Sequence, residues 1–344
     1  MQAIELVGPR DVRQRTREQP SFGPEEVLVE ITHVGICGSD RHWYEHGRMG
    51  DRVVENPLVL GHESAGRLVE SGSNVSGFSS GDRVAIEPGV PCGSCEFCRS
   101  GRYNLCPDVE FMATPGTDGA LRDYVAWPAE YVHQLPASVS LREGALCEPA
   151  SVGLHAVRRA EVDPGDSAAV VGGGPIGLIS MMVARAAGAA ELSIVDIVED
   201  KLHRARELGV DHAFDGTRAD LATHVAETVV DAPDVVIEAS GSQAGVETAV
   251  SLAGRDGTVV LVGLAPAAEV PLRPFDLVRN QVDIRTSYRF ANTYADVLSM
   301  IAADRIEPNR LVDFELPFSE IESAFRRLET EPVIKGVIGL DRSS

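Results

Sequence analysis

The first third of the chain has the hydrophobic pattern of short β-strands. Apolar and polar residues alternate with a period of two over 26–31, and more loosely over 2–7. Further apolar runs at 66–70 and 82–86 are separated by turns rich in Gly, Ser and Asn. Such alternation places successive side chains on opposite faces of a strand. The pattern therefore predicts an irregular β-barrel or sandwich.

The middle of the chain changes to alternating strands and helices. An apolar strand begins at Ser167 and runs into Gly172, and a helix is predicted over 178–187. Further helices are predicted over 199–208 and 245–253, and further strands at 191–195, 213–214, 234–238, 257–263 and 282–286. Strands that alternate with helices in this way indicate a parallel, doubly wound sheet.

Mixed elements flank this α/β region. A helix is predicted over 145–159, and the tail contains a helix, a strand, a helix and a strand at about 293–303, 312–316, 319–329 and 335–340. A chain of 344 residues is longer than is usual for a domain with a single hydrophobic core. We therefore expect two domains.

A glycine motif follows the strand that begins at Ser167. Residues 172–177 spell Gly-Gly-Gly-Pro-Ile-Gly, which contains G-x-G-x-x-G, and Asp196 lies nineteen positions after Gly177. Between a strand and a helix, this motif predicts that a dinucleotide pyrophosphate binds at the helix N-terminus. Asp196 would accept hydrogen bonds from the adenosine ribose and repel a 2′-phosphate, which favours NAD over NADP. A glycine-rich turn without a ligand is the alternative.

Four cysteines lie close together in a short segment with little else that could form a core. They follow the pattern C-x2-C-x2-C-x7-C at Cys92, Cys95, Cys98 and Cys106. Four thiolates at this spacing can close a tetrahedral structural zinc site. An iron–sulfur cluster is a second possibility for the same ligands.

A second group of possible ligands lies upstream. Cys37, His62 and Glu63 offer a thiolate, an imidazole and a carboxylate, the ligand types that zinc accepts. Three protein ligands leave one coordination position open, which is typical of catalytic zinc. Alternatively, Cys37 is a small buried residue and His62-Glu63 an exposed polar turn, since free cysteines commonly serve in packing.

Composition narrows the function classes. The formal net charge is −21, so nucleic acid and anionic membranes are disfavoured as partners. The sequence has no apolar run long enough for a membrane helix and no signal peptide pattern, so we expect a cytoplasmic protein. Nearly all basic residues are arginine; the lysines are Lys201 and Lys335. This indicates either adaptation to a salt-rich cytoplasm or a GC-rich genome.

With these motifs in place, the whole chain resembles the zinc-dependent medium-chain alcohol dehydrogenases, and within them the sorbitol/xylitol-type polyol dehydrogenases. The resemblance rests on the glycine motif, the four cysteines and several short tracts: Gly35-Ile-Cys-Gly-Ser-Asp40, Glu45-His-Gly-Arg-x-Gly50, Gly61-His-Glu63, Ala113-Thr-Pro-x-x-Asp-Gly119 and Glu148-Pro-x-Ser-Val-Gly-x-His155. The tracts at 45–50 and 113–119 point to the polyol branch.

The resemblance implies a two-domain fold. A GroES-like, β-rich catalytic domain would comprise 1–152 and 288–344 and include a structural-zinc lobe at 90–107. A Rossmann NAD-binding domain would comprise 153–287. Two zinc ions per chain are implied, one held by the four cysteines and one by Cys37, His62 and Glu63, with Glu148 holding the zinc-bound water or replacing it. Members of this branch are commonly homotetramers and sometimes homodimers.

The resemblance also implies residue roles in the oxidation of a secondary hydroxyl of a polyol to a ketose, with NAD as hydride acceptor. Catalysis would involve Glu148, with Ser39 taking the alcohol proton and passing it toward His42. Substrate contacts are implied for Ser39, Trp43, Glu148, Arg289 and Phe290. Cofactor contacts are implied for Gly172, Gly174, Pro175, Ile176, Gly177, Asp196, Lys201, Val262, Gly263, Leu264 and Arg289.

Two departures from the family pattern concern the substrate pocket. Trp43-Tyr44 reverses the expected aromatic order, and Phe290 stands where tyrosine is common, so the exact polyol stays open. Threonine dehydrogenases and sugar 1-dehydrogenases share the same zinc and nucleotide motifs and are the alternatives within the enzyme class. A non-catalytic, crystallin-like nucleotide-binding protein is the alternative from another class.

Overall fold

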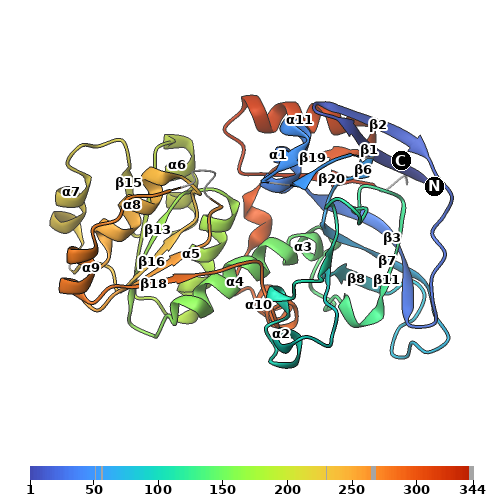
Figure 1. The fold of residues 1–344 in the computed structure, drawn as a ribbon, viewed down its shortest axis with the longest axis horizontal. Helices are drawn as coiled ribbons and strands as arrows, with labels where there is room; N and C mark the ends of the chain where they lie inside the picture. The colour runs from blue at the N-terminus through green and yellow to red at the C-terminus, as the bar shows by residue number, and fades with distance from the viewer. Residues whose placement is uncertain (51, 56, 230, 265–268, 341–344) are drawn as a thin grey trace. The chain divides into compact units, whose positions relative to one another are not determined.

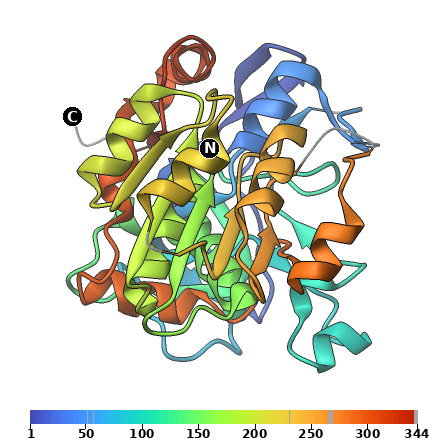
Figure 2. The ribbon, with the colours of Figure 1, turned by 90° about the vertical axis from the view of Figure 1, so that its left-hand side faces the viewer.

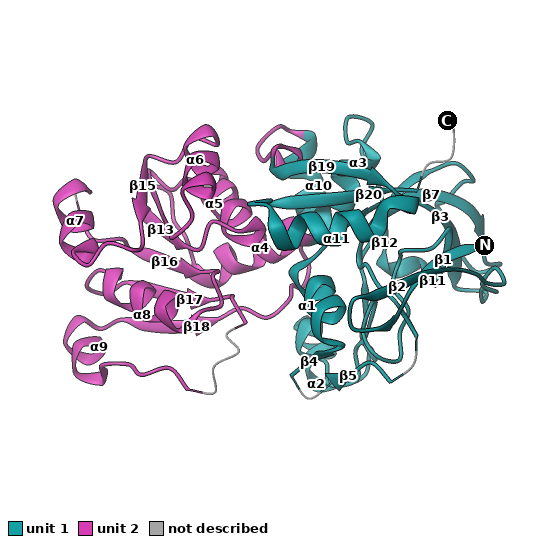
Figure 3. Cartoon of the chain, turned by 90° about the horizontal axis from the view of Figure 1, so that it is seen from above, with its two compact units in different colours: residues 1–148, 294–302, 311–344 teal, residues 149–293, 303–310 magenta. Residues whose placement is uncertain are grey.

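The computed structural model describes residues 1–50, 52–55, 57–229, 231–264 and 269–340. The chain forms two compact units, coloured separately in Figure 3. Unit 1 comprises Met1–Glu148, Tyr294–Ala302 and Leu311–Ser344, and unit 2 comprises Pro149–Thr293 and Ala303–Arg310.

Unit 1 is built on a seven-stranded sheet in which strands from both ends of the chain are neighbours (Figure 1). The hydrogen-bonded order is β12 (Val132–Gln134), β8 (Arg83–Ile86), β7 (Glu63–Ser71), β3 (Glu26–Gly35), β20 (Lys335–Gly339) and β19 (Val312–Pro317), and β11 (Tyr124–Pro128) also pairs with β3. The pairing of β20 with β3 joins the C-terminal segment to the N-terminal domain. This long-range pairing makes one domain from two distant stretches of sequence.

Smaller elements complete unit 1. A three-stranded sheet contains β2 (Asp11–Thr16), β1 (Gln2–Gly8) and β6 (Leu58–Val59). Two-stranded ladders join β10 (Glu110–Phe111) to β9 (Gly89–Val90) and β4 (Arg48–Met49) to β5 (Arg52–Val53). The helices are α1 (Gly38–His46), α2 (Glu96–Arg99), α3 (Leu141–Ala145), α10 (Tyr294–Ala302) and α11 (Ile321–Thr330), and α4 (Cys147–Ala160) begins in this unit. Apolar side chains of β1, β3, β7 and α11 form one buried core.

Unit 2 is a six-stranded, fully parallel sheet with helices on both faces (Figure 2). Its order is β15 (His212–Asp215), β14 (Glu191–Asp196), β13 (Ser167–Val171), β16 (Val235–Glu238), β17 (Thr258–Leu261) and β18 (Asp283–Thr286). Figure 3 shows α5 (Pro175–Ala187) and α6 (Glu199–Glu207) on one side, and α8 (Gln243–Leu252) and α9 (Pro274–Asn280) on the other. A further helix, α7 (Leu221–Thr228), follows β15. The predicted doubly wound sheet is confirmed.

The domain boundaries differ from those expected. The expected N-terminal segment ended at 152, whereas the first segment of unit 1 ends at Glu148, the second residue of α4. The expected C-terminal segment began at 288, but 288–293 and 303–310 belong to unit 2. Hydrogen bonds join 303–310 to unit 2: Arg310 donates to Glu207 O at 2.7 Å, and Arg305 donates to Ala186 O at 3.0 Å.

Sequence patterns missed several short helices. Among the described residues, α1, α2, α3, α7 and α9 were not predicted. The first of these begins with a capping arrangement in which the Asp40 carboxylate accepts a hydrogen bond from Cys37 N at 3.0 Å. Capping stabilises a short helix whose apolar pattern is weak. This helix begins directly after the predicted ligand Cys37 and carries Ser39 and His42.

Candidate functional site

The candidate metal centre lies where β3 ends and β7 begins. Cys37 lies two residues after Gly35, the last residue of β3, and Glu63 opens β7 after His62. The two strands are antiparallel neighbours with Gly35 opposite Glu63. The ligand atoms of Cys37, His62 and Glu63 all lie within 4.8 Å of one another. Strand pairing therefore brings the two halves of the predicted ligand set together.

Asp40 supports this arrangement and was missed at the sequence level. Its side chain is 1% exposed, and its two oxygens accept hydrogen bonds from Cys37 N at 3.0 Å and Gly61 N at 2.9 Å. Oδ1 also lies 3.8 Å from His62 Nδ1. Carboxylates next to metal-binding histidines orient the imidazole ring. The capping position three residues after Cys37 was the available signal.

The electrostatics of the centre favour a cation. Although Cys37 keeps some contact with solvent, desolvation of its sulfur and the nearby Glu63 carboxylate raise the pKa of the thiol to about 11. Burial also raises the pKa of Glu148 to about 8, with Glu63 and Cys37 adding to the effect and His62 opposing it. A bound divalent ion would reverse these shifts because it stabilises the anionic forms. The donor set thus fits zinc.

Glu148 interacts electrostatically with the three predicted ligands, but its carboxylate lies outside their cluster. It lies in the first turn of α4 and is buried. Its carboxylate does not belong to the group of ligand atoms within 4.8 Å of one another that the described residues form. The predicted role of Glu148, as a ligand or as a partner of bound water, stays a prediction.

The remaining catalytic predictions fall on α1. Ser39 is half-buried in the first turn, and its hydroxyl hydrogen-bonds to the Cys37 thiol. His42 is exposed one turn later, with its ring centroid 5.9 Å from that of His46. Trp43 is 1% exposed and packs in the core of unit 1. Its burial gives no support to the predicted contact between Trp43 and substrate.

The four-cysteine lobe gathers its thiols around one point. Sulfur atoms of Cys95 and Cys98 are 3.4 Å apart, those of Cys92 and Cys98 are 4.0 Å apart, and Cys92 N donates to Cys106 Sγ at 3.3 Å. All four ligand atoms lie within 4.8 Å of one another. A zinc tetrahedron with Zn–S bonds of about 2.3 Å has S···S edges of about 3.8 Å. The spacing therefore fits zinc, and all four cysteines are free thiols.

Hydrogen bonds lower the pKa of the Cys92 thiol, which favours the thiolate that a metal binds. Backbone and side-chain bonds from Ser94, with a further backbone bond from Cys95, lower the pKa of the Cys92 thiol to about 6. Desolvation and the neighbouring thiols raise the pKa of Cys98 to about 12. Four thiols so close together cannot all ionise without a cation. A metal would remove that restriction.

The predicted dinucleotide site occupies the carboxyl end of β13. Gly172 has a φ of 103°, and a Cβ on Gly177 would lie 1.8 Å from Gly172 O. Side chains are excluded at both positions, so strand and helix approach closely. Gly174 is the N-cap of α5 and Pro175 is its first residue, followed by Ile176. The turn thus presents a helix N-terminus suited to a phosphate.

Asp196 ends β14 next to this turn. Its side chain is buried, and its oxygens accept hydrogen bonds from Gly173 N at 2.6 Å and Val198 N at 2.8 Å. Lys201 Nζ lies 3.9 Å from Oδ2. Asp196 lies nineteen positions after Gly177 in the sequence, yet in the folded unit its carboxylate contacts the glycine turn.

Other predicted cofactor residues follow β17. Backbone N–H groups of Val262 and Gly263 donate to Glu238 O at 2.8 and 3.1 Å, and Leu264 is 71% exposed. Glu238 itself was missed by sequence reasoning. It is fully buried at the end of β16, where Oε1 accepts hydrogen bonds from Ser240 N and Gly241 N. The sheet order reverses between β13 and β16, the place where such sheets bind ligands.

Arg289 and Phe290 both belong to unit 2. Arg289 has a φ of 51°, and its guanidinium lies 5.0 Å from the centroid of the Tyr288 ring. Phe290 is buried. Their predicted contacts with substrate, and for Arg289 with cofactor, stay predictions.

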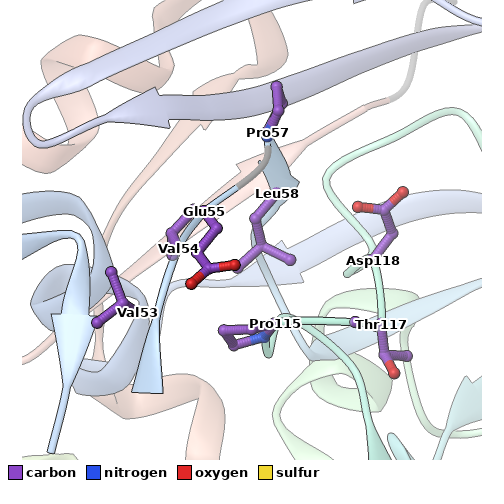
Figure 4. A pocket seen from close by; sticks show the side chains of 9 residues that line it. Val53, Val54, Glu55, Pro57, Leu58, Pro115, Thr117 and Asp118 are labelled. Carbon is purple, nitrogen blue, oxygen red and sulfur yellow. The ribbon is translucent and has the colours of Figure 1, made fainter. Parts of the chain in front are cut away.

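A pocket in unit 1 adjoins the segments that lead to the metal centre (Figure 4). It has a volume of about 360 Å³ and is lined by Val53, Val54, Glu55, Pro57, Leu58, Pro115, Gly116, Thr117 and Asp118. One side of the pocket is formed by β6 and the residues before it, and the chain continues from β6 to His62. The other side is formed by 115–118, which come shortly after Phe111, and the ring centroid of Phe111 lies 5.5 Å from that of His62. Sequence reasoning assigned no role to these lining residues.

The helices give no sign of a membrane span. Over the described part of the chain, every helix is too short or too polar to cross a bilayer.

Comparison with known proteins identifies the class. The alcohol dehydrogenase GroES-like domain matches residues 23–137, and the zinc-binding dehydrogenase domain matches residues 175–303. A structure from Sinorhizobium meliloti, described as a zinc-binding dehydrogenase bound to NADP, has a TM-score of 0.91 at 30% identity over 98% of each chain. Fold and site together define a dehydrogenase class that uses zinc and a nicotinamide cofactor.

Two further relatives narrow the assignment. A sorbitol dehydrogenase from Gallus gallus is 41% identical over 335 residues, which cover 96% of this chain and 94% of that protein. An Escherichia coli oxidoreductase of unknown specificity has a TM-score of 0.93 at 36% identity over 98% of each chain. The chain belongs to the zinc-dependent medium-chain alcohol dehydrogenases, in their sorbitol dehydrogenase branch.

Proposed function

We propose that this protein oxidises a secondary hydroxyl of a sorbitol- or xylitol-like polyol to a ketose, with NAD as hydride acceptor. The observation that carries the proposal is the convergence of Cys37, His62 and Glu63, with ligand atoms within 4.8 Å, in a chain 41% identical to a sorbitol dehydrogenase. We further propose two zinc ions per chain, one in this centre and one in the four-cysteine lobe.

The metal, the cofactor and two residues of unit 1 would each have a separate role in the reaction. Zinc in the centre would act as a Lewis acid on the substrate hydroxyl, and NAD would accept the hydride. Ser39, whose hydroxyl hydrogen-bonds to the Cys37 thiol, is placed to take up the proton of the substrate hydroxyl. His42 lies three residues further along the same helix and is exposed, so it can pass the proton to solvent. Ser39 and His42 thus provide a route for the proton.

The preference for NAD follows from Asp196. Its carboxylate holds the glycine turn through Gly173 N at 2.6 Å, close to where an adenosine ribose would bind. A 2′-phosphate at that place would meet the negative charge of Asp196, although Lys201, 3.9 Å away, offsets part of it. The relative from Sinorhizobium meliloti is bound to NADP, so cofactor preference needs its own measurement.

A substrate panel tests the proposal directly. NAD reduction by the zinc-loaded protein is measured with sorbitol, xylitol, arabitol, ribitol, threonine and glucose. We expect kcat/KM to be highest for one of the four polyols. Highest activity with threonine would indicate a threonine dehydrogenase, and highest activity with glucose a sugar 1-dehydrogenase. No turnover with any panel member by a protein containing two zinc ions would contradict the proposed function.

We also propose a cytoplasmic homo-oligomer, either a tetramer or a dimer. Phe275 and Val278 are 76% and 78% exposed on α9, the helix that precedes the edge strand β18 of the parallel sheet. Apolar side chains next to an edge strand favour association with a second copy. Sedimentation of the protein alone distinguishes monomer, dimer and tetramer.

A further inference from the structure

Lys335 is a buried cation at the candidate metal centre. It is the first residue of β20, and its side chain is 2% exposed. The ammonium donates hydrogen bonds to Glu63 Oε1 at 2.5 Å and to the carbonyl oxygen of Ile36 at 2.9 Å. It also lies 2.5 Å from Glu63 Oε2. One ammonium therefore contacts both a predicted ligand and the backbone next to another, Cys37.

The choice of lysine is unusual for this chain. Only Lys201 and Lys335 are lysine among 31 basic residues. A lysine ammonium is compact, whereas the planar fork of arginine needs more room and a fixed geometry. The ammonium is buried, and its contacts are Glu63 and the carbonyl oxygen of Ile36.

Backbone geometry builds the ion pair into the centre. β20 is antiparallel to β3, with Val337 opposite Gly35, and Gly336 O accepts a hydrogen bond from Ile36 N at 3.0 Å. A Cβ on Gly35 would lie 2.1 Å from Glu63 Oε2, so the absence of a side chain makes room for the carboxylate. The pair thus joins the three strands that supply Cys37, Glu63 and Lys335.

Charge explains why a cation is needed there. A buried carboxylate without a partner is strongly unfavourable, and a second one, Glu148, lies nearby. In the metal-free chain, Lys335 is the partner of Glu63. A divalent ion held by Cys37, His62 and Glu63 would supply positive charge to the same carboxylate. The ammonium of Lys335 would then repel it.

We propose that Lys335 is a positioning residue of the metal centre that takes the place of the metal's charge when the centre is empty. It holds Glu63 beside Cys37 and His62 in the metal-free protein, and it moderates zinc affinity once the metal shares the carboxylate. The inference rests on the proposed metal centre, but not on which alcohol is oxidised.

The test compares zinc affinity and thermal stability in Lys335→Met and Lys335→Gln with those of the full-length wild type. Zinc affinity is measured by chelator competition, with the four-cysteine site as internal reference. We expect the variants to bind zinc in the Cys37 centre at least about tenfold more tightly, because a repelling charge is gone. The metal-free variants should melt at lower temperature than wild type, and the zinc-loaded variants close to it.

Lys201→Met is the matched control, since it removes the same charge from unit 2. It should leave the zinc affinity of the Cys37 centre unchanged. Because the chain has only two lysines, lysine-selective side-chain NMR of the wild type gives a second measurement that needs no variant. The Lys335 signal should shift on zinc loading, and the Lys201 signal should not.

A purely structural ion pair predicts something different. The variants would then melt lower in both forms, with unchanged zinc affinity, and that result would overturn the proposal. Weaker zinc binding by the variants, or a Lys335 signal indifferent to zinc, would also overturn it. If the wild type binds zinc as expected but oxidises no polyol, the proposed function fails while the role of Lys335 stands.

Discussion

At the scale of single residues, function depends on side chains whose neighbours alter their chemistry. The Cys37 thiol has its pKa raised to about 11 by burial and by Glu63, so it becomes a thiolate readily only when a metal binds. Asp196 is held by two backbone N–H groups at 2.6 and 2.8 Å, which fixes its carboxylate beside the glycine turn. Each of these residues leads to a substitution with a defined outcome.

The first substitution is Cys37→Ser. A serine hydroxyl is a poor zinc ligand, so kcat/KM for polyol oxidation should fall at least about a hundredfold. Loss of a residue that only supports a metal ligand costs up to about a hundredfold, and loss of the ligand itself should cost no less. NAD binding, measured by fluorescence titration of NADH, should persist because unit 2 is untouched. Cys147→Ser is the control, because that thiol is buried outside the ligand trio and contacts Tyr294 O. A comparable rate in Cys37→Ser would refute the metal assignment.

The second substitution is Asp196→Ala. Loss of the carboxylate removes hydrogen bonds to the NAD ribose and the repulsion of a 2′-phosphate, so the NAD/NADP ratio of kcat/KM should fall by about tenfold or more. Asp215→Ala is a matched control: Asp215 pairs in register with Asp196 on the neighbouring strand but bonds only locally to Thr217 in the described structure. An unchanged ratio in Asp196→Ala would show that another group sets cofactor preference.

At the scale of elements, the four-cysteine lobe is the part that we expect to depend most on a metal ion for its stability. Its helix α2 has only four residues, none of them buried. An element without an apolar core needs another source of stability, and a structural zinc would supply it. The lobe at 90–107 should therefore lose its order when one ligand is removed.

The substitution that tests the lobe is Cys98→Ser. Elemental analysis should find one zinc per chain in place of two, and the melting temperature should fall by several degrees, as for a loss of about 2 kcal/mol or more. Because the Cys37 centre remains, turnover at low temperature should persist. Visible absorbance typical of iron–sulfur clusters in the wild type, with no zinc in the lobe, would instead favour the iron–sulfur alternative.

At the scale of the whole molecule, the dominant property is charge. A net charge of −21 makes like charges on the surface repel one another, and salt screens that repulsion. The melting temperature should therefore rise from low salt to molar KCl. An osmolyte at equal osmolality is the control, since it does not screen charge. Equal melting temperatures in low and molar KCl would argue for codon bias as the source of the arginine-rich composition.

The sequence was informative wherever chemistry is local. The cysteine spacing of the lobe and the glycine turn with Asp196 lie within short stretches, so one strand, turn or helix nearly determines their geometry. Helices and strands with strong periodicity were found for the same reason. Short helices such as α1 and α7 were missed because capping and tertiary packing, not a long apolar pattern, stabilise them.

The amino-acid sequence by itself thus predicted the fold class, the glycine turn and two candidate sets of metal ligands, because their residue types and spacings match known zinc and dinucleotide motifs. Tertiary structure decided what surrounds them. It placed Trp43 in the core, Asp40 on two backbone N–H groups, and Lys335 on Glu63 across 272 positions of sequence. These contacts depend on the register of β3, β7 and β20, and pairing between distant strands leaves no local pattern in the chain.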